Sequence, residues 1–182
     1  MIRRAGLAAL ALGLPGLGAC VSAPQGYAPV GQAEAPVFDP FTFFAGQSTG
    51  TGTLAKIRAA YTPVQVSSRG HIITQTTREA SWAAPARRVL VIDQTVREGE
   101  KPARTRQWRI HEVAPGRYEG TLSDAIGPVT GYTQGNLLVL EFTLKGSFKV
   151  RQELILSPDG RHAHNVMRVS MLGVTAAVLV ED

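Results

Sequence analysis

A serine, an aspartate and a histidine occur in the chain order of one class of hydrolase. The segment Gly46 to Gly50 reads G-x-S-x-G around Ser48, and Asp124 and His162 follow it. In such enzymes the histidine removes the serine proton and the acid orients the histidine. The nucleophile elbow joins a buried strand to a helix, whereas here an aromatic turn precedes the serine and a strand-like segment follows it. A glycine-rich start of a strand explains the same residues, so this triad is only the alternative.

Two of the four histidines alternate as a metal-binding pair on one face of a strand would. They are His162 and His164. Zinc takes three or four protein ligands, and no spacing indicates that His71 or His111 supplies a third. The sequence therefore predicts no metal site and no cofactor. Because no other group of catalytic residue types is visible, it also predicts that the protein is not an enzyme.

The single cysteine, Cys20, offers a definite chemistry. A short basic start and an apolar stretch precede it, and the residues Leu17, Gly18 and Ala19 stand directly before it. This pattern resembles the lipobox of bacterial lipoproteins, in which signal peptidase recognises the small residues and the thiol becomes a thioether to diacylglycerol, with acyl chains such as palmitate. We expect residues 1–19 to be removed as a signal peptide. An ordinary secretory leader cut after Ala19 is the alternative.

The residues that follow the lipobox indicate a tether and a location. Val21 rather than an acidic residue comes after the cysteine, which by resemblance to Gram-negative sorting favours the outer membrane facing the periplasm, with the inner membrane as the alternative. Residues 20–39 contain several prolines and glycines and no hydrophobic period, which is typical of a flexible linker. The expected membrane contact is the lipid.

Composition limits the fold and the partners. A chain of 182 residues that loses a leader fits one domain, here residues 40–182. Its 19 glycines and 11 prolines, with 7% aromatic residues, favour an all-β domain. Without Arg3 and Arg4 the chain carries 17 basic and 14 acidic side chains, and they are interspersed. A nucleic-acid partner would need a concentrated basic face with stacking aromatics, so none is expected.

Alternation of apolar and polar residues predicts strands. The clearest pair, 138–145 and 148–156, turns at Gly146 and predicts a hairpin. Similar segments recur at about ten-residue spacing, which predicts about ten antiparallel strands, and closure into an up-and-down, lipocalin-like barrel removes exposed edges. The candidate lining of this barrel consists of inward-facing apolar residues, namely Leu138, Leu140, Phe142, Phe148, Val150 and Leu154.

A spaced series of glycines and aromatics carries a family resemblance. It includes Gln107-Trp108-Arg109-Ile110, Ser123-Asp124-Ala125-Ile126-Gly127, and Phe43-Phe44-Ala45-Gly46 followed by Gly50 and Gly52. These motifs resemble a family of uncharacterised proteobacterial lipoproteins, classed as a domain of unknown function. The resemblance implies a lipocalin-like barrel on a lipid anchor, without an established activity.

One loop is a candidate motif of the fold. Its residues are Asp124, Gly127 and Gly131, and they suit a kinked strand and its turn. Asp124 either hydrogen-bonds backbone N–H groups in the bend or faces a ligand.

The sequence thus favours a membrane-anchored lipoprotein whose barrel binds an apolar or lipid-like molecule or supports the cell envelope. Two alternatives remain open. One is an envelope hydrolase or isomerase that uses Ser48, Asp124 and His162, and the other is a structural module that binds proteins. The sequence does not name the protein partners.

Overall fold

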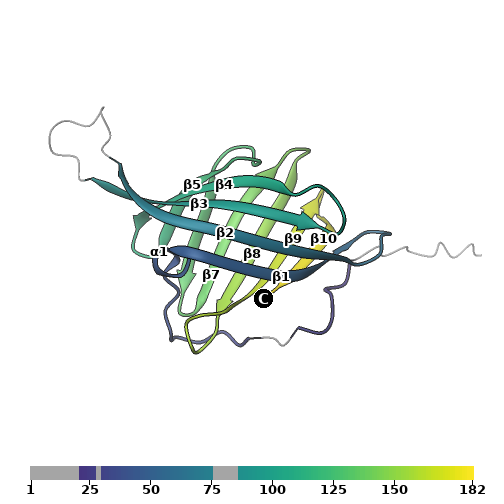
Figure 1. Ribbon diagram of the computed structural model, residues 1–182, viewed down its shortest axis with the longest axis horizontal. Helices are drawn as coiled ribbons and strands as arrows, with labels where there is room; N and C mark the ends of the chain where they lie inside the picture. The colour runs from purple at the N-terminus through teal and green to yellow at the C-terminus, as the bar shows by residue number, and fades with distance from the viewer. Residues whose placement is uncertain (1–20, 28–29, 76–85) are drawn as a thin grey trace, which may run out of the picture.

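The computed structural model describes residues 21–27, 30–75 and 86–182. This part of the chain forms a short helix and a closed antiparallel barrel of ten strands, in which each strand pairs with its neighbours in sequence and β10 closes onto β1 (Figure 1). The predicted all-β barrel is confirmed. The elements are α1 (Pro40–Phe43), β1 (Gly46–Lys56), β2 (Thr62–Gln75), β3 (Arg87–Glu98), β4 (Arg104–Ala114), β5 (Arg117–Leu122), β6 (Val129–Gln134), β7 (Leu137–Leu144), β8 (Phe148–Leu156), β9 (Ala163–Met171) and β10 (Val174–Glu181).

The first two strands contain glycines within them. β1 begins at Gly46, so Ser48 lies inside a glycine-rich start of a strand. β2 runs through Gly70 without a break. A Cβ at Gly70 would lie 1.8 Å from the carbonyl oxygen of Phe44. This glycine therefore permits a close approach of the segment after α1 and does not end the strand.

The chain ahead of the barrel, expected as a linker, makes specific contacts where it is described. It runs along the outside of the barrel before α1 (Figure 1). The buried side chain of Asn136 accepts a hydrogen bond from the Ala33 N–H (2.7 Å) and donates to the carbonyl oxygens of Gly31 (3.1 Å) and Leu156 (2.9 Å). Phe38 is 1% exposed. The packed unit thus begins before residue 40, where the sequence analysis placed its start.

The main core fills one part of the barrel. Phe38 and Phe41 pack there against inward-facing residues of β3 to β8, and the rings of Trp108 and Phe142 meet edge to face at 5.3 Å. Five of the six residues expected to line the barrel belong to this buried cluster, namely Leu138, Leu140, Phe142, Val150 and Leu154. Phe148 is half-buried and lies outside it, because it begins β8 directly after the turn at Gly146.

A smaller apolar cluster lies elsewhere in the barrel. Its buried members are Val64, Val66 and Leu179, and Leu54, Val96 and Met167 pack against them. Among the described residues, no helix has the length and hydropathy needed to cross a membrane.

Candidate ligand-binding site

The structure does not assemble the serine triad suggested by the sequence. Ser48 lies in β1, Asp124 in the turn after β5, and His162 before β9. In the described part of the chain no hydrogen bond joins any two of them. The His162 Nδ1 atom instead lies 2.9 Å from Asp159 Oδ2, in the same exposed turn. Hydrogen bonds from the Ser157 hydroxyl, the Arg161 N–H and His162 lower the pKa of Asp159. The carboxylate of Asp159 therefore has its hydrogen-bond partners within its own turn.

The histidines likewise have separate partners. His164 Nδ1 lies 2.6 Å from Asp182 Oδ1, and His111 Nε2 lies 3.0 Å from an Arg87 guanidinium nitrogen. β9 begins at Ala163, so His162 is not on the strand that carries His164. Within residues 21–27, 30–75 and 86–182, no three His, Cys, Asp or Glu side chains gather as metal ligands would.

An interior cavity of about 210 Å³ lies between the walls of the barrel. This volume is below the roughly 300–1,000 Å³ of drug-sized pockets. It exceeds an engineered apolar cavity of about 150 Å³ that holds benzene. The cavity therefore has room for a small molecule. Its apolar lining includes Leu54, Val64, Val66, Ile92, Leu140, Leu154, Met167 and Leu179.

A row of polar side chains crosses one wall of this cavity. Ser48, Ser68, Gln94 and Arg106 are paired in register across β1, β2, β3 and β4, and all four line the cavity. Gln94 Nε2 donates to the Ser68 hydroxyl (3.1 Å), and Arg106 Nε donates to Gln94 Oε1 (2.5 Å). We call these four residues the inner polar row. They also line a wider hollow of about 680 Å³, so the row adjoins both spaces.

Arg106 is the cation of this row. The centre of its guanidinium lies 5.4 Å from the Trp108 ring centroid. Among the described residues, its two terminal nitrogens have no hydrogen bond or ion pair. Burial lowers the pKa of Arg106, and the carboxylates of Asp124 and Glu181 oppose that shift without reaching ion-pair distance. Because arginine keeps its charge in proteins, the cavity wall contains a cation without a direct counter-ion.

Glu181 supplies an acid to the same cavity. Burial raises the pKa of its carboxyl group, against a hydrogen bond from Asn165 and the charge of Arg106. A Cβ at Gly50 would lie 2.1 Å from Glu181 Oε1, and one at Gly52 would lie 2.9 Å from Glu181 Cβ. Gly50 therefore leaves space for the carboxyl group, whereas Gly52 permits the close approach of β10, since a Cβ there would also lie 2.5 Å from the Val180 carbonyl oxygen. Both are also glycines of the family resemblance.

Two buried oxygens of the cavity lining are unpaired in the described structure. They are Gln152 Oε1 and Asn165 Oδ1. A buried acceptor without a donor costs about 1–3 kcal/mol. Such groups are where a ligand gains hydrogen bonds that the protein does not make for itself.

The candidate motif loop divides into residues with different surroundings. Asp124 Oδ1 is buried without a hydrogen-bond partner among the described residues, so this oxygen does not bind the backbone of its turn. Gly127 has a φ of +79° with open space around it, as a turn requires. Gly131 lies in β6, and a Cβ there would lie 2.7 Å from the Val139 carbonyl oxygen. The loop residues are absent from the cavity lining.

The sequence analysis missed two charged residues of the cavity, Arg106 and Glu181. Arg106 lies two residues before Trp108 and four before Ile110, which are both in the core, so strand alternation would have placed its side chain inside. Glu181 likewise lies two residues after the buried Leu179 on β10, so alternation places both side chains on the same face of the strand. A charged residue on the apolar face of a strand was the available signal.

The fold is a closed, lipocalin-like barrel with an interior cavity. Residues 16–159 match the model of a family described as "Protein of unknown function (DUF3833)", so the chain belongs to that family and the predicted resemblance to a domain of unknown function is confirmed. The S-type phycobiliprotein lyase from Guillardia theta has a similar structure. The alignment covers 78% of this chain and 87% of the lyase, with a TM-score of 0.54 and 11% sequence identity. No curated protein matches the sequence.

This likeness corrects one prediction. The lack of a recognisable catalytic group led the sequence analysis to predict that the protein is not an enzyme. That prediction is wrong, because a similar barrel belongs to a lyase and the inference from missing motifs does not hold for this architecture. At 11% identity the likeness shows the fold alone, and the lyase activity is that of the Guillardia theta protein.

Proposed function

We propose that this protein is an outer-membrane lipoprotein, anchored through Cys20 and facing the periplasm, whose barrel binds a small apolar molecule in its interior cavity. The lipobox Leu17-Gly18-Ala19-Cys20 supports the anchor and lies outside the described residues. The observation that carries the binding function is the cavity of about 210 Å³, bounded by apolar side chains on several strands.

The chemistry of the lining favours an apolar ligand body. Transfer of apolar surface from water contributes roughly 25 cal/mol per Å². Leu140 and Leu154 approach the cavity from β7 and β8, and Val66 and Leu179 from β2 and β10. About half of the lining residues are apolar, and most of the others are polar or charged. In a small-molecule site the apolar surface binds the body of the ligand and the polar groups orient it.

Filling the cavity tests the binding function. In Val66→Phe the added ring enters the cavity, whereas Gln65→Phe places the same ring on the exposed face of β2. Overpacking costs about 1–3 kcal/mol, so we expect Val66→Phe to weaken the binding of a neutral apolar probe about tenfold or more. Gln65→Phe should bind as the natural protein does. Equal binding by both folded variants would contradict the proposal.

The anchor has its own test. Mass spectrometry of the mature protein extracted from membranes should find an acylated Cys20, and Cys20→Ser should move the protein to the soluble fraction. Density separation of the two membranes should recover the natural protein with the outer membrane. A mature chain that keeps an unmodified thiol would contradict the anchor and leave the cavity proposal standing.

A second candidate function is catalysis on the bound molecule. Glu181 favours it, because a carboxyl group with a raised pKa inside a cavity is suited to proton transfer. The test compares molecules retained by the natural protein and by Glu181→Gln after incubation, using mass spectrometry. A product formed by the natural protein alone supports catalysis, and identical retained molecules favour simple binding.

A further inference from the structure

We infer that the cavity binds a small amphipathic monocarboxylate, whose carboxylate pairs with the terminal guanidinium nitrogens of Arg106 while its apolar body lies beside Leu140 and Leu154. This inference rests on the proposed binding function and names the ligand class of the same site.

The orientation of Arg106 leaves the required edge of the guanidinium available. Its Nε atom is held by Gln94 Oε1 at 2.5 Å, and Gln94 is itself bonded to Ser68 at 3.1 Å. Trp108 donates weakly to the same Gln94 oxygen (3.4 Å) and supports the guanidinium with its ring. Both terminal nitrogens then remain to donate. Two parallel N–H···O bonds are the preferred geometry between arginine and a carboxylate.

The charge of Arg106 favours an anion as the group that binds it. Arg106 cannot give up its proton to relieve its burial. Glu181 can become neutral, because burial raises the pKa of its carboxyl group. A cation in a cavity is stabilised by an anion that reaches it, and Asp124 and Glu181 interact with it only beyond ion-pair distance.

The same surroundings favour a single negative charge. The ligand carboxylate would lie in the field of Asp124 and Glu181 as well as that of Arg106. Gln152 and Asn165 add unpaired oxygens to the lining, and these repel further anionic oxygens. The cavity lining contains three arginines and three acids, namely Arg104, Arg106, Arg161, Glu98, Glu181 and Asp182. A doubly charged phosphate monoester therefore meets more repulsion there than a carboxylate. The apolar lining then requires that the rest of the ligand be uncharged.

The experiment compares probes with one apolar body and different head groups. Hexanoate, hexanol, hexylamine and hexyl phosphate are titrated into the full mature protein at neutral pH. The readout is the NMR signal of the Trp108 indole N–H, which lies beside Arg106. The chain has two tryptophans, and Trp82→Phe assigns the signal. We expect hexanoate to bind about ten times or more tightly than hexanol, because charge-assisted hydrogen bonds are the stronger ones.

Substitutions then separate the head group from the cavity. Arg106→Gln should lose the preference and bind hexanoate and hexanol equally. Arg106→Lys should keep part of the preference, since a point charge replaces the two-pronged donor. Arg151→Gln, on the outside of the barrel, is the matched control and should behave as the natural protein. Thermal unfolding verifies that each variant is folded.

The outcomes separate the carboxylate site from the proposed binding of an apolar molecule, on which that site rests. Equal affinity of the natural protein for hexanoate and hexanol would overturn the carboxylate site and leave apolar binding in place. A preference for hexanoate over hexanol that survives in Arg106→Gln would also overturn the carboxylate site. Tighter binding of hexyl phosphate would overturn the choice of carboxylate. If none of the probes binds, the proposed binding function fails and this inference fails with it.

Discussion

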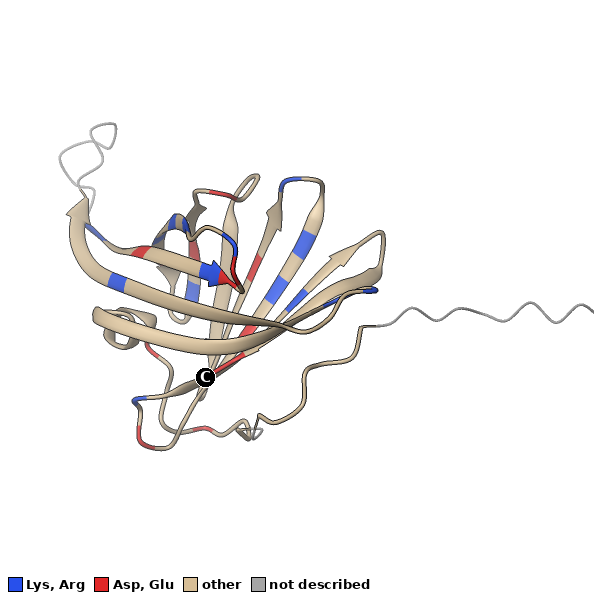
Figure 2. Ribbon diagram, turned by 45° about the vertical axis from the view of Figure 1, so that its right-hand side comes forward, with Lys and Arg blue, Asp and Glu red and all other residues tan. Residues whose placement is uncertain are grey.

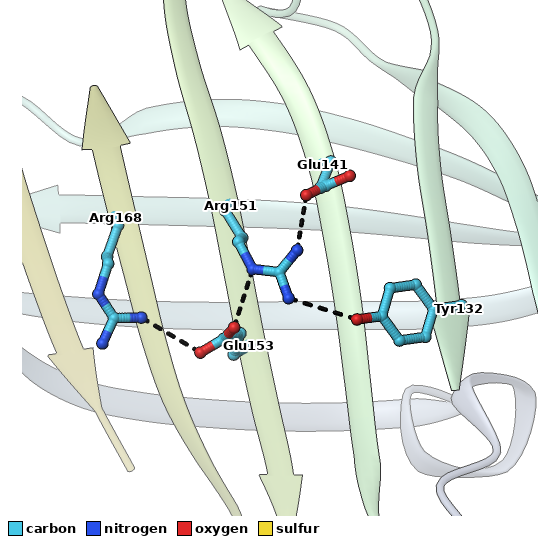
Figure 3. Close-up of polar contacts among 5 residues, drawn as sticks. All are labelled: Tyr132, Glu141, Arg151, Glu153 and Arg168. Carbon is cyan, nitrogen blue, oxygen red and sulfur yellow. Dashed lines mark hydrogen bonds and ion pairs between the residues drawn. The ribbon is translucent and has the colours of Figure 1, made fainter. Parts of the chain in front are cut away.

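Two arginines on opposite faces of this barrel have opposite surroundings. On the outside, Arg151 uses all three side-chain nitrogens, to Glu141 (2.7 Å), Glu153 (2.8 Å) and the Tyr132 hydroxyl (3.3 Å) (Figure 3). Arg168 completes this outer network through Glu153 (3.1 Å). On the inside, Arg106 uses one nitrogen. Hydrogen bonds to Tyr132 and the two glutamates raise the pKa of Arg151, whereas burial lowers that of Arg106.

The difference separates a cation that the fold satisfies from one that it leaves available. Acidic and basic residues are interspersed over the strands of the barrel (Figure 2), and exposed pairs among them contribute little because water already solvates them. On the inner face Arg106 is half-buried, and a charge that is partly removed from water costs more when it has no direct partner. A fold that keeps such a charge there has a reason beyond packing, and binding is the reason we propose.

The largest expected effect is a loss of stability when Trp108, which supports the side chain of Arg106, is truncated. Trp108 is 4% exposed and packs against Phe142 as well as Arg106. Trp108→Ala should lower the free energy of unfolding by about 3–5 kcal/mol, because it leaves a large void in the core. Urea denaturation measures this. The corresponding outer change, Tyr132→Ala, should cost clearly less, and equal losses would remove the distinction between the two regions.

The next effect concerns the space for the inner acid. A Cβ at Gly50 would lie 2.1 Å from Glu181 Oε1, so Gly50→Ala forces the glutamate to move. We expect a loss of about 1 kcal/mol in unfolding free energy, the low end for overpacked sites, because the nearest atom is the end of a flexible side chain. Adding Glu181→Ala should recover much of it. Gly31→Ala is the control, since nothing lies within 4 Å of its Cβ position, and a similar loss there would contradict the steric explanation.

A stabilising effect of smaller size is expected at Glu181 itself. Because its pKa is raised in the folded state, the unfolded chain loses this proton first as pH rises, and stability falls between the unfolded and folded pKa values. Glu181→Gln should therefore be more stable than the natural protein at neutral pH and equal to it in acid, below both values. Urea denaturation across this pH range measures the difference.

Glu98 gives the opposite pH dependence and serves as the control. Burial would raise its pKa, but hydrogen bonds from Lys101 and Lys56 outweigh burial and lower it. Stability from Glu98 is present above its unfolded pKa and is lost as pH falls through the folded value. Glu98→Gln should thus destabilise the protein at neutral pH. If both variants shift stability in the same direction there, the assigned surroundings are incorrect.

The smallest expected effect is in the outer network. Arg151 is 41% exposed in its side chain, and surface ion pairs contribute about 0–1 kcal/mol. Arg151→Gln should change the free energy of unfolding within that range, and added salt should reduce the difference further. A double-mutant cycle with Glu141→Gln measures the pair itself. A coupling of several kcal/mol would place the outer network among the main determinants of stability.

Much of the barrel was predictable because strand alternation is local. The predicted hairpin is formed by β7 and β8, with β7 one residue earlier than predicted, and Leu138, Leu140 and Val150 are buried as alternation required. The role of Gly70 was not predictable in this way, because it depends on the distant segment after α1. Phe148 has the right parity but lies at the end of a strand. Alternation shows which way a side chain faces and not how deep in the barrel it lies.

The sequence by itself determined the lipobox motif, the alternating strands and the glycines that accompany them. The tertiary structure decided that Arg106 from β4 and Glu181 from β10 share a cavity, and that Asn136 holds residues 31–33. It also decided which polar groups stay unpaired. Closure and the register of all ten strands set these relations, because residues far apart in the chain meet only when each strand pair is fixed.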